Sequence, residues 1–95
     1  MATKEAYQKK LEAQLKEWDA RLAQLSAKAQ KATADARINY ENELEKLKGK
    51  RAAAHKTLEE FGKRGENTWE DMKDGVEKVW DEMGKAMEKV AARFK

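Results

Sequence analysis

Apolar side chains recur along the first part of the chain at alternating steps of four and three residues, the spacing of a coiled-coil seam. The seam begins with its bulkiest members, Leu11, Leu15, Trp18, Leu22 and Leu25, and continues with three alanines, Ala29, Ala32 and Ala36. Residues 4–61 contain no proline and one glycine, which costs a helix only about 1 kcal/mol. We therefore predict one continuous helix over about residues 4–61. At 1.5 Å per residue it would be about 85 Å long.

The middle of this seam is rich in alanine. Six alanines lie between Ala23 and Ala36, both included, and after Leu25 the seam positions are Ala29, Ala32 and Ala36, which bury little area. The steps from Ala32 to Leu44 are all of four residues. This slip is equivalent to one inserted residue and should locally unwind a left-handed supercoil. The pattern favours a zone of thin packing over a dedicated binding groove.

Residues 62–67 form the only credible turn in the sequence. Either Gly62 or Gly65 can adopt the left-handed conformation that ends a helix, and Asn67 followed by Glu70 resembles a capping box. A second helix over about residues 68–94 would follow, and such a short connection makes two helices antiparallel neighbours. A single helix running through both glycines stays open as an alternative.

The second helix repeats every 11 residues: the segment 68–78 aligns with 79–89, and a third copy begins at Val90. Eleven residues span three helical turns, so the repeat places its apolar residues in a nearly straight stripe. We expect this stripe to pack against the end of the first helix. The predicted core of the hairpin is Tyr40, Leu44, Leu47, Leu58, Phe61, Trp69, Met72, Val76, Trp80, Met83, Met87, Val90 and Phe94.

The two predicted helices differ in length, and this difference predicts that the chain forms an oligomer. A second helix of about 27 residues covers only the later half of a helix that spans residues 4–61. Leu11, Leu15, Trp18, Leu22 and Leu25 would then stay in water, which forgoes about 1.5–3 kcal/mol for each buried side chain. We therefore predict that these residues form the interface of a homodimer or higher homo-oligomer. The expected fold is an all-α, elongated coiled-coil bundle of helical hairpins.

The apolar stripe of residues 68–94 has a second interpretation. Repeats of 11 residues with Trp and Met resemble those of exchangeable apolipoproteins and desiccation-tolerance proteins, which implies reversible binding to a lipid or membrane surface. Helices that bind membrane surfaces usually carry a basic polar face, whereas acidic residues dominate one flank here, so the pattern favours a protein core. A third interpretation is a chain that folds only on drying or on meeting a partner, because 41% of its residues are charged.

Composition and charge exclude several classes of protein. No apolar run is long enough to cross a membrane, no secretory signal is visible, and the absence of cysteine excludes disulfides and thiol chemistry. The basic cluster around Lys46–Arg51 is diluted by glutamates, and the net charge is only +3. We therefore do not expect a nucleic-acid partner. Another protein is a further candidate partner.

Motifs for catalysis or metal binding are missing from the sequence. His55 is the only histidine, and Glu59 lies one helical turn away as a partner rather than as part of a ligand set. Ser26 is the only serine and has no neighbouring histidine to activate it. The carboxylates alternate with lysines, which is typical of solvated helix faces. We predict no enzyme activity, no metal and no cofactor.

Two segments resemble a known group of proteins. The first is residues 1–19, MATKEAYQKKLEAQLKEWD, and the second is the repeat that contains Trp69 and Trp80. They are similar to small, largely uncharacterised bacterial coiled-coil proteins, some of which are labelled stress-response proteins. The resemblance implies a cytoplasmic bacterial protein with a structural or protective role. It implies no catalytic residues.

Overall fold

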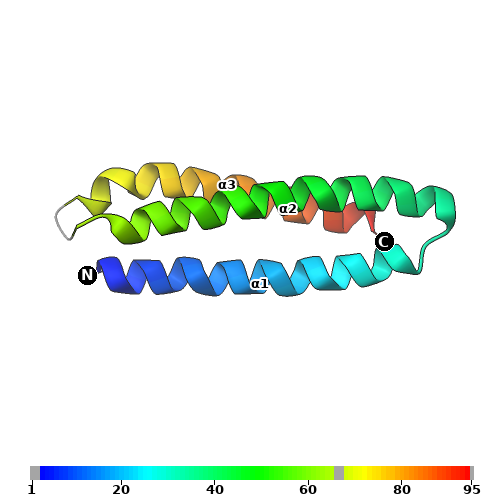
Figure 1. The fold of residues 1–95 in the computed structure, drawn as a ribbon, viewed down its shortest axis with the longest axis horizontal. Coiled ribbons are helices and arrows are strands. Elements are labelled where there is room, and N and C mark those ends of the chain that lie inside the picture. The colour runs from blue at the N-terminus through cyan, green and yellow to red at the C-terminus, as the bar shows by residue number, and fades with distance from the viewer. Residues whose placement is uncertain (1–2, 66–67, 95) are drawn as a thin grey trace.

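A computed structural model describes residues 3–65 and 68–94 of the chain, and these residues form a bundle of three helices (Figure 1). The helices are α1 (Lys4–Gln30), α2 (Ala34–Lys63) and α3 (Trp69–Arg93). Their axes are nearly parallel to the long direction of a molecule that measures 52 × 18 × 16 Å. The prediction of an all-α fold is confirmed for the described residues.

The predicted continuous helix over residues 4–61 is wrong, because the chain turns back at Lys31, Ala32 and Thr33. Thr33 caps α2: its hydroxyl accepts a hydrogen bond from the backbone N–H of Ala36 at 3.5 Å. Asp35 in the first turn of α2 also favours a helix start here. The turn lies within the alanine-rich stretch, where little packing area is lost, and the fold-back lets α1 bury its apolar face in its own chain.

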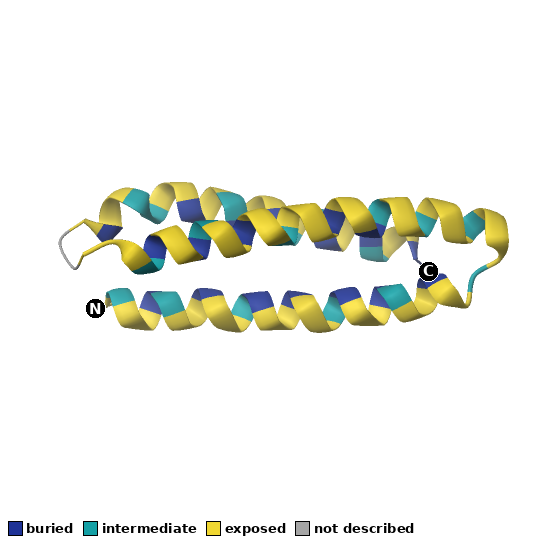
Figure 2. Ribbon diagram, viewed as in Figure 1, coloured by how far each residue is buried: buried dark blue, intermediate teal, exposed yellow. Residues whose placement is uncertain are grey.

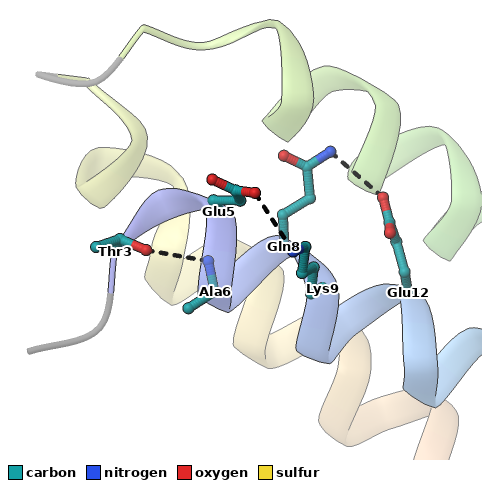
Figure 3. A network of polar contacts seen from close by, with 6 residues as sticks. All are labelled: Thr3, Glu5, Ala6, Gln8, Lys9 and Glu12. Carbon is teal, nitrogen blue, oxygen red and sulfur yellow. Dashed lines mark hydrogen bonds and ion pairs between the residues drawn. The ribbon is translucent and has the colours of Figure 1, made fainter.

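A side-chain cap marks the start of α1. Thr3 is the N-cap, and its hydroxyl accepts a hydrogen bond from the backbone N–H of Ala6 at 3.1 Å (Figure 3). Glu5 and Lys9 form an exposed ion pair across one turn at 3.3 Å. Such a pair adds only a few tenths of a kcal/mol. The cap therefore contributes more than the ion pair to fixing where α1 begins.

α2 and α3 are separate helices, so the alternative of a single helix running through both glycines is wrong. α2 ends at Lys63 and α3 begins at Trp69. Neither Gly62 nor Gly65 is left-handed, which corrects the predicted glycine cap. Instead, Lys4 Nζ reaches from α1 and donates hydrogen bonds to the carbonyl oxygens of Gly62 at 3.0 Å and Arg64 at 2.5 Å. The predicted Asn67 cap lies outside the described residues.

One apolar core runs along the inside of the bundle (Figure 2). Eleven of the thirteen predicted core residues are buried, while Tyr40 and Met72 are half-buried against the same core. The core contains no buried charged or polar residue among those described. It also includes three residues beyond both predicted sets, namely Tyr7, Ala29 and Ala54.

The five residues predicted to form a dimer interface lie in this core. Leu11, Leu15, Trp18, Leu22 and Leu25 are all buried by the chain's own α2 and α3. The argument that a second copy must cover them therefore fails, because it depended on a continuous first helix.

Candidate functional site

An aromatic cluster joins all three helices at the end of the bundle where α1 begins. The ring of Tyr7 lies 5.5 Å from that of Phe61 and 5.8 Å from that of Trp69, measured between centroids. Phe61 and Trp69 meet edge to face at 5.9 Å. Sequence analysis missed Tyr7, although it lies four residues before Leu11 on the same helical face. This cluster holds the first turn of α1 against the turn between α2 and α3.

Tyr7 carries the one strongly shifted acid group among the described residues. Burial of the phenol, together with the negative charge of nearby Glu77, raises the pKa of Tyr7 from 10.0 to about 12. The hydroxyl donates a hydrogen bond to Glu77 Oε1 at 3.4 Å. Both effects favour the neutral phenol in the folded protein.

This shift predicts a loss of stability in alkali. Because the folded state holds the phenol proton more tightly than the unfolded state, the contribution is complete below pH 10 and is lost as pH rises towards 12. We expect the free energy of unfolding to fall more steeply over this range in the wild type than in Tyr7→Phe. Urea unfolding at several pH values measures the difference. Tyr40→Phe, which removes the other tyrosine hydroxyl, is the matched control, and equal slopes for wild type and Tyr7→Phe would contradict the prediction.

A groove of about 590 Å³ runs between α1 and α3, where the two helices contact each other less than either contacts α2. Trp18 and Trp80 form its floor, with ring centroids 5.8 Å apart. The Nε1 atom of Trp80 is buried and has no hydrogen-bond partner among the described residues. The groove is rimmed by charges of both signs, including Lys10 and Asp81. Because both signs of charge are present, this rim favours neither an anionic nor a cationic ligand.

A second groove, of about 530 Å³, runs between α1 and α2. Arg51 binds Asp19 across it with two hydrogen bonds, at 2.8 and 2.9 Å. The hydrogen bond to Asp19 raises the pKa of Arg51, so the guanidinium stays charged. Arg51 belongs to the basic cluster around Lys46–Arg51. Its charge is balanced within the chain by the carboxylate of Asp19.

His55 lies on the rim of this second groove. It pairs with Glu59, Nε2 to Oε1, at 3.0 Å, the partner suggested by the sequence. The described residues include no group of three or more His, Cys, Asp or Glu side chains arranged to hold a metal ion. Ser26, the only serine, is half-buried on α1 and lines a separate hollow between α1 and α2. These positions bring together no catalytic set.

The end of the bundle that contains the turn at residues 31–33 is a further candidate region. We call it the tip and define it as residues 27–39. α3 stops at Phe94, whose ring lies 4.2 Å from that of Tyr40. Beyond this contact α1, α2 and the turn between them are the only described parts of the chain (Figure 1). Ala32 and Ala36 are half-buried there, and Ile38 is 60% exposed. The tip is thus the part of the bundle without a third helix.

No described helix is long and apolar enough to cross a membrane. Comparison of the chain with protein-family models, with curated proteins and with solved structures gave no match.

Proposed function

We propose that this chain is a non-enzymatic helical protein that acts by associating with protein chains, its own copies first, in a structural or stress-associated role. The supporting observation is the incomplete tip. α3 ends beside Tyr40, so Ala32 and Ala36 on the inner side of the tip have two helices around them where the rest of the bundle has three. Small residues let another helix approach closely, and a helix from a second copy would complete the three-helix packing there.

The rest of the described surface supports the same proposal. Four of the six ion pairs among the described residues join side chains one helical turn apart, as in the pair of Lys85 with Asp81 at 3.0 Å. The large apolar side chains, Ile38 excepted, lie in or against the core. Such a surface supplies few groups for chemistry, which favours a role in protein association.

Oligomeric state as a function of concentration tests the proposal. Light scattering coupled to gel filtration, and sedimentation equilibrium, are expected to give a mass that rises from one chain towards two between low micromolar and near millimolar concentration. Ala32→Lys places a charge at the tip and should weaken this association, whereas Gln24→Lys adds the same charge at an exposed position of α1 and should not. A mass of one chain at every concentration would overturn the proposal.

Lipid binding by α3 is the second candidate, favoured by its continuous apolar face. That face is buried against α1 and α2, so α3 would have to leave the bundle to reach a lipid surface. A blue shift of tryptophan emission is a poor test, because all three tryptophans are already buried. Quenching by brominated phospholipids in neutral and in anionic vesicles is the better measurement. Absence of quenching in both would exclude this candidate.

A further inference from the structure

We propose that this chain forms a domain-swapped dimer by straightening the turn at residues 31–33, so that α1 of each copy packs on α2 and α3 of the other. The inference deepens the proposed self-association, on which it rests, by naming the segment that is exchanged and the hinge that permits it. The partner is a second copy of this chain.

The first support is the backbone of the hinge. Lys31 keeps right-handed helical angles, φ −88° and ψ −7°, and only the ψ of 160° takes Thr33 out of the helical region. Neither glycine nor proline is present at residues 31–33, and no described residue of the chain has a positive φ. The hinge is therefore made of residues that a helix accepts, and ψ of Thr33 is the angle that must change there for the helix to continue.

The second support is the alignment of the two core faces across the hinge. At 100° per residue, an uninterrupted helix would place the core positions of α1 and α2, from Tyr7 to Phe61, within a single arc of about 120°. Ala32 and Ala36 fall in the same arc. The joined helix would thus carry one continuous apolar face of about 90 Å, along which two antiparallel copies match: α1 of one lies beside α2 of the other.

The third support is that the exchange preserves the contacts that hold α1 in place. The hydrogen bonds from Lys4 to Gly62, the pair of Asp19 with Arg51, and the contact of Trp18 with Trp80 all join α1 to the rest of the chain. Each forms equally well between two copies. The balance between monomer and dimer is then set by the hinge and by concentration.

In the swapped dimer the tips of the two copies join into one continuous segment. The two hinge segments would lie side by side at the two-fold axis, where Ala29, Ala32 and Ala36 of both long helices face each other. Their small side chains allow a close crossing at this point. The exchange thereby packs the alanines of the two hinges against each other at a point that α3 of neither copy reaches.

Two substitutions at the hinge separate the states in opposite directions. Thr33→Ala removes the cap that starts α2 and supplies a better helix former, which favours the straight helix. One cap is worth roughly fivefold in an equilibrium constant, and a dimer has two hinges, so dimerisation should tighten by about 25-fold. Ala34→Pro is compatible with the first position of α2 and with the extended Thr33 before it. In a straight helix the proline is expected to lower the equilibrium constant for dimerisation by more than about a hundredfold at each hinge.

The experiment measures dimer dissociation constants by sedimentation for wild type, Thr33→Ala and Ala34→Pro. Thr33→Ala is expected to dimerise more tightly than the wild type, and Ala34→Pro is expected to give no detectable dimer. At low concentration the melting temperature of Ala34→Pro should be at least that of the wild type. If Ala34→Pro dimerises like the wild type, the swap is overturned while self-association stands. If wild type and Thr33→Ala both remain monomeric at every concentration, both proposals fail. Dimerisation of Thr33→Ala alone supports the hinge mechanism and rejects self-association of the wild type.

A second measurement identifies the exchanged segment. The chain has no cysteine, so Asp19→Cys and Arg51→Cys can be made in separate copies, which are unfolded together and refolded at high concentration. A short bis-maleimide should then link α1 of one variant to α2 of the other. Ala34→Pro added to both variants is the control and should abolish the link. Dimers that form without this link would overturn the exchange.

Discussion

Replacing Phe61 by alanine is expected to lower the free energy of unfolding by about 3–5 kcal/mol. The side chain of Phe61 is completely buried and contacts the rings of Tyr7 and Trp69, so its loss leaves a cavity where all three helices meet. Because about 1 kcal/mol shifts the melting temperature of a domain of this size by roughly 4–8 °C, a fall of more than about 10 °C should accompany it. Urea unfolding followed by circular dichroism measures the change.

Ile38→Ala is the matched control for this prediction. Ile38 also lies on α2, but its side chain is 60% exposed. Removing it is expected to change the free energy of unfolding by no more than about 0.5 kcal/mol. If the two substitutions have equal effects, the aromatic cluster does not hold the helices together in the way described.

Leu15→Asp is expected to unfold most of the protein at 25 °C. Leu15 is 5% exposed and faces the core from the middle of α1. The substitution replaces a packed apolar side chain by a carboxylate, and we expect a cost of at least about 4 kcal/mol, a large share of the stability of a small domain. The loss of helical circular dichroism should already be seen at low micromolar concentration, because Leu15 packs within one chain in the monomer.

Lys16→Asp introduces the same residue at the next position, which is exposed, and should leave the helix content unchanged. The comparison also separates the structure from the hairpin predicted from the sequence. In that hairpin Leu15 lies in a dimer interface, so Leu15→Asp would halve the mass and leave the second helix folded against the end of the first. Such a result would contradict the three-helix bundle.

The sequence predicted helical structure and most of the buried positions, because both depend on periodic spacing, although it joined α1 and α2 into one helix. The 11-residue repeat located the core face of α3, and the later heptads located Leu44, Leu47 and Leu58 on α2. Such positions follow from helical geometry alone, whatever the helix packs against.

The turn at residues 31–33 could not be predicted in the same way. Lys31, Ala32 and Thr33 are all compatible with a helix, and the seam passes through them in phase. The only local signals for a break were a threonine followed by Asp35, a weak helix start, and the alanine-rich stretch around it. What decides the turn is the energy of packing α1 onto α2 and α3, which no short window of sequence contains.

The candidate sites were less predictable than the fold. The pairs Asp19 with Arg51 and Arg93 with Glu43, at 2.6 Å, join residues more than thirty positions apart. They exist because the chain folds back at both turns, so a prediction with one turn could not find the first of them. The local pair of His55 with Glu59 was found because both residues lie on one helical face.

The wholly apolar character of the core has an evolutionary consequence. Leucine, methionine, valine and the aromatic residues replace one another in such an interior at modest cost, provided that volume and spacing are kept. No buried hydrogen bond among the described residues ties the fold to a particular side chain. Descendants of one ancestral bundle of this kind are therefore expected to retain its rhythm of apolar positions long after their residue identities have diverged.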